Sequence, residues 1–331
     1  MKSNKNWIKY NILILMIFLI FGLCVIITEW IAQKKMGLGQ PIIYDAHPLW
    51  GYSPRANKKY FRFKGDVVTI NNVGVRSTEK WRNDGKNILF LGDSVTYGGS
   101  YINDNETFVY LACTELQNWS CFNAGVNGYG ILNMVARSRY DSRISDAPLR
   151  IFTFITDDFD RGLQKSNTAH FILREPPKKF NAIWEILNFV SSNISPKTWF
   201  GKKSDIIDQN RILNEKKVSQ KFALDIFLDE LERLDEEGLN YLIIHSPSVS
   251  EIKNSQLIKN NHIILKIKNQ YPERFYTLTE FFKESYNINN QLIFKDDVHY
   301  EELGHLLASK KLSQILTKVL KKIENKNKNL N

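Results

Sequence analysis

The chain has few cysteines and lacks any grouping of cysteine and histidine that is typical of a metal site. Only three of its 331 residues are cysteine and six are histidine. No two cysteines have the C-x₂₋₄-C spacing that accompanies a histidine pair in structural zinc sites. We therefore expect no metal and no cofactor.

The sequence also lacks internal repeats and a stripe of basic residues. Its formal net charge is +10, but the lysines are scattered along the chain. Nucleic-acid-binding domains gather their basic residues on one face or along one helix. We expect no nucleic-acid partner and interpret the surplus of lysine as a solvated surface.

Charge is missing altogether from Tyr10 to Thr28. At about 1.5 Å per residue, a helix of this length is about 30 Å long and nearly crosses the apolar core of a bilayer. Trp30, of a type enriched at membrane interfaces, follows the run. Three lysines precede it and favour a cytoplasmic N-terminus: Lys2, Lys5 and Lys9.

These features predict that residues 1–36 are a short cytoplasmic stub and a single-pass signal anchor in the cytoplasmic (inner) membrane. The remaining chain would then lie outside the cytoplasm. A cleaved signal peptide is the rival interpretation, but the apolar run is long for one and no small-x-small cleavage site follows it.

The three cysteines add one open question. Cys24 lies in the predicted span, whereas Cys113 and Cys121 would lie in an oxidising compartment. A disulfide between these two and a pair of separately buried thiols both remain possible.

Residues 37–85 form a polar, turn-rich lead segment, in which "DVVTINNVGVRS" alternates like an edge strand or a hairpin. From residue 86 to 325 short apolar runs alternate with helical patterns, which is typical of a parallel sheet with helices on both faces. Residues 326–331 are a polar tail. The expected strands are 87–92, 120–125, 150–156, 240–247 and 274–279, and the expected helices are 107–117, 132–140, 221–238, 256–271 and 301–323.

The alternation is interrupted between about residues 161 and 219, where we expect an insertion with one or two helices. The insertion is rich in aromatic residues, including Trp184, Trp199 and Phe200. Two interpretations stay open: these side chains pack the insertion onto the domain, or they face a substrate or a membrane.

Chemistry is expected where the apolar run "NILFLG" ends at Gly-Asp-Ser, because parallel sheets bind ligands beyond the carboxyl ends of their strands. Ser94 lies just past such an end and needs a base and an orienting group to act as a nucleophile. Asp296 and His299 are three residues apart and suit those two roles. Asp297 is the rival acid, and Asp93 is expected to brace the turn.

An acyl-transfer site also needs donors for the negative charge that develops on the substrate oxygen. The glycines of "FNAGVNGYG" allow a close approach of the backbone. We predict that the amides of Gly128 and Ser94 form part of an oxyanion hole. We expect structural roles for the other two histidines considered, His245 and His305, although a place in the lining of the cleft stays open for His245.

"FLGDSVTYGG", "NAGVNGYG" and "DDVHYEELGHLLA", in this order, resemble the GDSL/SGNH hydrolases, and in particular their bacterial branch with an N-terminal membrane anchor. The resemblance covers roughly residues 65–315. It implies an α/β fold, a three-layer α/β/α flavodoxin-like sandwich with a mainly parallel sheet. It implies that Ser94 is the nucleophile, that Asp296 and His299 complete the triad, that Gly128 lines the oxyanion hole, and that no metal is needed.

The sequence departs from the family's Gly-x-Asn-Asp block, because Asp157 stands where the oxyanion-binding asparagine is expected. A carboxylate cannot donate, and losing one such donor costs about 10²–10³ in rate. Three explanations remain open: a protonated Asp157, a substitute donor from Asn127 or Thr156, or a weakened or non-catalytic protein.

The sequence therefore predicts a membrane-anchored, extracytoplasmic serine esterase or deacylase. Members of the family cleave or transfer acyl esters, often acetyl groups on sugars, so an acylated envelope carbohydrate is the expected substrate. A lipid ester is the rival substrate. The alternatives are an O-acyltransferase with the same triad and a glycan-binding or scaffold protein on the same fold.

Overall fold

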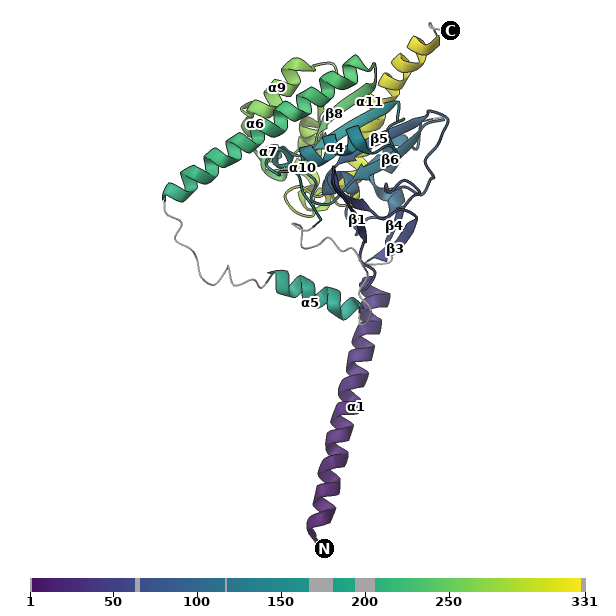
Figure 1. The fold of residues 1–331 in the computed structure, drawn as a ribbon, viewed down its shortest axis with the longest axis vertical. Helices are drawn as coiled ribbons and strands as arrows, with labels where there is room; N and C mark the ends of the chain where they lie inside the picture. The colour runs from purple at the N-terminus through teal and green to yellow at the C-terminus, as the bar shows by residue number, and fades with distance from the viewer. Residues whose placement is uncertain (1, 63–65, 117, 167–180, 194–205, 329–331) are drawn as a thin grey trace. The chain divides into compact units, whose positions relative to one another are not determined.

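The computed structural model describes residues 2–62, 66–116, 118–166, 181–193 and 206–328, drawn as ribbons in Figure 1. The chain divides into two compact units. The anchor unit comprises residues 1–41, 61–66 and 175–202, and the sheet unit comprises residues 42–60, 67–174 and 203–331.

A five-stranded sheet forms the centre of the sheet unit. Its strands lie in the order β6-β5-β7-β8-β9, and every neighbouring pair is parallel. This is the doubly wound order of flavodoxin-like folds, so the predicted fold class is confirmed. The strands are β5 (Asn87–Gly92), β6 (Ser120–Gly125), β7 (Leu149–Phe154), β8 (Asn240–His245) and β9 (Phe275–Thr277).

Alternate residues of each central strand enter two separate apolar cores. All six residues of β5 are buried. Leu89 and Leu91 belong to one core, and Ile88 and Phe90 belong to the other. Successive side chains of a strand point to opposite faces, so a strand that is apolar throughout requires helices on both faces of its sheet.

Two sets of helices supply those covering faces, which gives the three layers. The first core receives side chains from α4 (Ile131–Tyr140), α6 (Ile206–Glu236) and α9 (His262–Gln270). The second core receives them from α3 (Phe108–Cys113), α7 (Val249–Lys253), α10 (Thr279–Ile293) and α11 (Glu302–Lys328).

The helices differ from the sequence predictions in several details. The predicted helix 256–271 is two helices, α8 (Gln256–Lys259) and α9. Asn261 separates them because its side chain accepts hydrogen bonds from two amides in the first turn of α9 and so acts as an N-cap. The predicted helix 107–117 is shorter, α10 was not predicted, and α11 includes the start of the predicted tail.

The lead segment contains two small strand pairs, of which the first is antiparallel. The first joins β1 (Tyr44–His47) to β2 (Gly51–Pro54), and the second joins β3 (Lys58–Arg62) to β4 (Asp66–Ile70). After β4 the backbone of Arg76 exchanges two hydrogen bonds with Asn123 of β6, with N···O distances of 2.8 and 3.3 Å. The lead segment therefore pairs directly with the central sheet.

The anchor unit contains α1 (Lys2–Met36) and α5 (Asn181–Asn193). Within the described part of the chain, α1 is the one helix that is long and apolar enough to cross a membrane, with a mean hydropathy of 2.9 in its most apolar window. A signal sequence shares these properties. Trp199 and Phe200 of the predicted insertion lie outside the described residues.

The structure answers the question about the cysteines. Cys113, at the end of α3, forms a disulfide with Cys121 on β6, with the two Cα atoms 5.9 Å apart. Cys24 is free and exposed on α1. A closed disulfide fits the expectation of an oxidising compartment for this part of the chain.

Candidate active site

Ser94 is the first residue of the short helix α2 (Ser94–Tyr97), immediately beyond the carboxyl end of β5. Asp93 is the N-cap of this helix, and its side chain accepts a hydrogen bond from the Val95 amide at 2.9 Å. A Cβ at Gly92 would lie 2.0 Å from Thr96 Oγ1, so the turn requires glycine there. The predicted bracing role of Asp93 is therefore observed, and Ser94 is left half-buried at the rim of the sheet.

The structure brings the three predicted triad residues together, although 205 positions separate Ser94 from His299. Ser94 Oγ lies 2.8 Å from His299 Nε2. His299 Nδ1 lies 2.7 Å from Asp296 Oδ2. A proton on Nδ1 directed to the carboxylate leaves Nε2 free to accept the proton of the serine hydroxyl.

Asp296 is fixed in this orientation by the backbone. Its Oδ1 atom accepts hydrogen bonds from the amides of His299, at 2.9 Å, and Val298, at 3.0 Å. Partial burial raises the pKa of Asp296, but these amides and the imidazole outweigh burial and hold the pKa below its usual value. The group is therefore a carboxylate at neutral pH.

Asp297, the rival acid, faces another element. Its Oδ1 atom accepts hydrogen bonds from the amide and the hydroxyl of Ser250 on α7, at 3.2 and 3.0 Å. The geometry thus selects Asp296 as the partner of the imidazole.

Gly128 adopts a left-handed conformation, with φ of +78°, in the turn after β6. Among the described residues, no acceptor is hydrogen-bonded to the amide of Gly128 or to that of Ser94. Two free amides at neighbouring strand ends are what an oxyanion hole needs. Their assignment to that role is part of the proposal below.

Asp157 is exposed in the 3₁₀ turn η2 (Thr156–Phe159) that follows β7. Its surroundings are not the dry site that a protonated carboxyl requires. Thr156 is also occupied, because its hydroxyl donates to Glu251 Oε1 at 2.6 Å. Asn127 Nδ2 donates to the Tyr44 hydroxyl at 3.3 Å and keeps a second hydrogen. Of the substitute donors considered from the sequence, only Asn127 is left.

A cavity of about 310 Å³ lies next to the loop between Asp296 and His299, although none of the three triad residues lines it. One part of the cavity is lined by Asp297 and Val298, the two residues between Asp296 and His299 in the chain. Another part is lined by Asp157. The other polar lining residues are Thr156, Ser248, Ser250, Glu251 and Asn261. Most of these groups can accept hydrogen bonds, so the cavity suits a ligand with several hydroxyl groups.

A partly buried arginine, not foreseen from the sequence, connects the strand ends next to Ser94. Arg161 Nη1 donates to Asp158 Oδ1 at 2.8 Å, to the Tyr129 carbonyl at 2.9 Å and to Asp93 Oδ2 at 3.5 Å. Burial raises the pKa of Asp158 well above its usual value, and the nearby carboxyl of Asp93 adds to this effect. Burial also raises the pKa of Asp93, against the opposing charge of Arg161.

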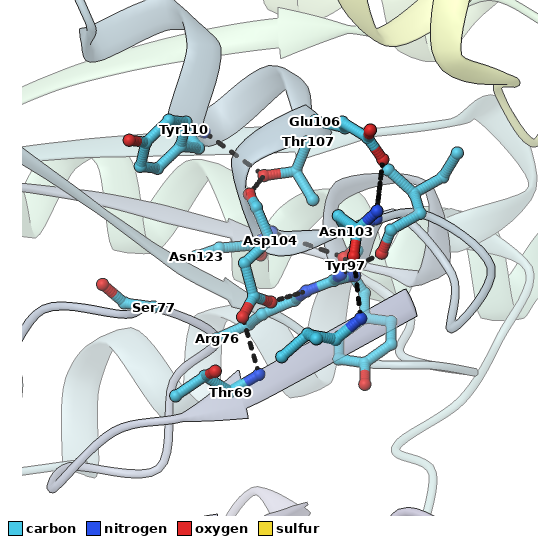
Figure 2. A network of polar contacts seen from close by, with 12 residues as sticks. Thr69, Arg76, Ser77, Tyr97, Asn103, Asp104, Glu106, Thr107, Tyr110 and Asn123 are labelled. Atoms are coloured by element: carbon cyan, nitrogen blue, oxygen red, sulfur yellow. Dashed lines mark hydrogen bonds and ion pairs between the residues drawn. The ribbon is translucent and has the colours of Figure 1, made fainter. Parts of the chain in front are cut away.

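A second arginine, which is fully buried, supports the loop that follows Ser94. Figure 2 shows Arg76 and Asp104 at the centre of this network. Arg76 is 3% exposed and its Nε donates to Asp104 Oδ1 at 2.9 Å. Its Nη1 donates to the carbonyls of Tyr97, at 2.7 Å, and Gly99, at 2.6 Å. The lead segment therefore holds the chain on the C-terminal side of the serine helix.

His245 and His305, the other two histidines considered from the sequence, are buried and bonded within the fold. His245 Nδ1 lies 3.1 Å from Thr277 Oγ1, and burial lowers the pKa of His245. His305 Nδ1 accepts from the Phe108 amide at 3.2 Å, and burial together with the charge of Arg76 lowers its pKa to about 3. Both are neutral at pH 7, which supports structural roles.

No protein-family model and no curated protein matches the chain. Among solved structures, an acetyl xylan esterase, AlAXEase, is similar over 70% of this chain and 99% of its own, at 15% identity and a TM-score of 0.43. A lipolytic G-D-S-L family protein from Veillonella parvula covers 70% of this chain and 98% of its own, at 15% identity and a TM-score of 0.38. A lipase/acylhydrolase from Enterococcus faecalis covers 70% and 95%, at 12% identity and a TM-score of 0.38. Similarity at this level assigns neither activity nor substrate.

We predict that Arg76→Met lowers the free energy of unfolding by about 3–5 kcal/mol, because it leaves the Asp104 carboxylate buried without its partner. The double variant Arg76→Met/Asp104→Leu should regain much of this loss. Chemical denaturation of both proteins measures the difference. If the loss in the free energy of unfolding of the double variant equals the sum of the losses of the two single variants, Arg76 and Asp104 are not energetically coupled.

We also predict a pH-dependent stability that comes from Asp158. Its pKa is raised in the folded state, so binding of its proton adds to the free energy of unfolding at low pH. This contribution is lost as the pH rises through the pKa of the folded state. Asp158→Asn should reduce this fall in stability. Thermal midpoints against pH test it, with the exposed neighbour variant Asp157→Asn as the matched control. The same slope in Asp158→Asn and in the wild type would contradict the assignment.

Proposed function

We propose that this chain is a serine ester hydrolase of the GDSL/SGNH type, anchored in the cytoplasmic membrane by α1 with its sheet unit outside the cytoplasm. Its proposed substrate is an acylated, above all acetylated, carbohydrate of the cell envelope. The observation that carries the proposal is the continuous hydrogen-bond chain from Ser94 through His299 to Asp296. The three sequence motifs that resemble this family supply its three blocks in order.

In the proposed reaction, Ser94 Oγ attacks the carbonyl carbon of the ester while His299 Nε2 takes the hydroxyl proton. The resulting oxyanion accepts hydrogen bonds from the amides of Ser94 and Gly128. The C–O bond to the sugar then breaks, and the imidazolium returns its proton to the departing sugar oxygen. Asp296 stabilises the imidazolium without itself taking the proton.

The acyl group on Ser94 is then released by water. His299 takes a proton from the water as its oxygen attacks the acyl carbon, and a second oxyanion forms at the same amides. When the bond to Ser94 Oγ breaks, the imidazolium returns the proton to the serine. The products are the free carboxylic acid and the original enzyme.

The polar groups of the cavity next to the loop between Asp296 and His299 support a carbohydrate as the substrate. Its polar lining of carboxylates and serine hydroxyls matches the donors and acceptors of a sugar, whereas its apolar lining residues are three: Ile155, Leu257 and Val298.

The same acyl-enzyme would serve an O-acyltransferase if a sugar hydroxyl replaced water. The two reactions differ only in which nucleophile reaches the acyl carbon. Measuring free acetate and acetylated saccharide together, with an acetyl donor and an added oligosaccharide, separates them. Acetate release that is unaffected by the saccharide supports the hydrolase.

The first prediction of this proposal concerns the nucleophile. A fluorophosphonate probe should label Ser94, and Ser94→Ala should abolish the labelling and reduce turnover of a chromogenic acetate ester by about 10⁴-fold or more. Ser145→Ala, at an exposed serine, is the matched control and should behave as wild type. A wild-type protein that neither reacts with the probe nor cleaves the ester would instead be a non-catalytic, glycan-binding member of this fold.

The second prediction concerns Asp157. Because an ionised carboxylate near the site opposes the developing oxyanion, Asp157→Asn should keep or raise kcat, by up to about tenfold, which corresponds to about 1.4 kcal/mol. Steady-state kinetics on the same ester measures this effect, with Asp160→Asn on the same turn as a control. A large loss of kcat in Asp157→Asn would give the carboxylate a positive role and would contradict this account.

A further inference from the structure

Helix α5 in the anchor unit has an exposed apolar face. Trp184, Leu187 and Val190 are 36%, 62% and 41% exposed. Their spacing of three residues places them along one side of the helix. We call these three residues the outer face of α5. Exposed apolar side chains that gather on one face mark a contact surface.

The opposite side of α5 is held by polar and apolar contacts within the same unit. Ala182 is buried in a small cluster with Ala32 of α1. Glu185 accepts hydrogen bonds from Arg62 Nη1 at 3.1 Å and from the Gly39 amide at 2.8 Å. Because these contacts fix the rotation of α5 about its axis, its outer face points away from them.

The start of α5 is bonded to the place where the apolar part of α1 ends. Glu29, the first charged residue after Thr28, accepts hydrogen bonds from the amides of Ala182 at 3.0 Å and Ile183 at 2.9 Å. A carboxylate satisfies the free amides and the partial positive charge of a helix N-terminus. Figure 1 shows α5 running across the axis of α1 and not along it.

We propose that α5 lies in the interface of the membrane that α1 enters, with its outer face in contact with lipid. A charged residue at the end of a membrane-spanning helix lies near the boundary of the apolar core, so Glu29 fixes the start of α5 at that depth. A helix that runs across α1 at this depth lies along the plane of the bilayer. The inference rests on the membrane anchoring within the proposed function.

The composition of α5 agrees with this placement. Tryptophan is enriched at the level of the lipid headgroups, and an interfacial helix buries one apolar face while its other face stays polar or protein-bound. The single charged side chain of α5, Glu185, is on the protein-bound side and paired with Arg62. The outer face therefore carries no charged side chain, and its contact with lipid would not require the desolvation of a charge.

The test uses the full chain in vesicles of phosphatidylcholine and phosphatidylglycerol, with a polarity-sensitive dye on a single free cysteine. Cys113 and Cys121 are paired, so Cys24 is the reactive thiol of the wild type. Dye on Cys24 should be quenched by nitroxides deep in the bilayer. Absence of this quenching would show that α1 is not inserted, and both the proposed anchoring and the inference would fail.

In Cys24→Ala/Leu187→Cys, dye at position 187 should be quenched severalfold more by lipids with a shallow nitroxide than by aqueous iodide. Quenching by iodide alone, with Cys24 quenched normally in the wild type, would overturn the inference and leave the anchoring intact. Protection from both quenchers would mean that a second copy of the chain covers the outer face, which also overturns it.

Cys24→Ala/Val218→Cys is the matched control, because Val218 is an apolar residue of α6 that is 71% exposed. Dye at this position should be quenched more weakly by the shallow nitroxide than dye at position 187. Equal quenching at both positions would show that the dye enters the bilayer by itself, and the inference would then be withdrawn.

Discussion

The candidate active site depends on the parallel register of β5 with its two neighbours. Gly92, the last residue of β5, pairs with Gly125 of β6 and with Thr153 of β7, so the three strands end at one edge of the sheet. The turn that carries Ser94 and the turn that carries Gly128 therefore leave the sheet side by side. Such an edge follows directly from the parallel arrangement, because the carboxyl ends of all the strands lie on the same side of the sheet.

Two arginines, the buried Arg76 and the partly buried Arg161, hold the turns at this edge in place. Arg161 bonds to side chains or carbonyls after all three strands, and Arg76 bonds to the carbonyls that follow the serine helix. A planar guanidinium has five donors in a fixed arrangement, so one side chain can fix several segments at once. Both arginines have buried carboxylate partners, which offset the desolvation of their charge. Rigid support of this kind keeps a catalytic serine and its base at hydrogen-bonding distance.

Much of the sheet unit could be predicted from local patterns. The continuous apolar run of β5, the alternation of strands with helices and the triad residues themselves are visible in the sequence. The features that were not predicted have local physical causes that hydrophobic periodicity does not reveal. Asn261 caps a new helix within a pattern that is apolar on both sides of it. The supporting roles of Arg76 and Arg161 were also missed, since nothing in their sequence neighbourhood distinguishes them from solvated arginines.

The sequence by itself determined that α1 is long and apolar enough for a membrane, that the sheet is parallel with helices on both faces, and which serine, histidine and aspartate are candidates. These properties follow from composition and period over a few turns or strands. Only the tertiary structure decided that His299 reaches Ser94, that Asp296 and not Asp297 faces the imidazole, and that Asp157 is exposed. Such contacts join segments far apart in the chain, and their distances depend on strand order and packing, which no local pattern encodes.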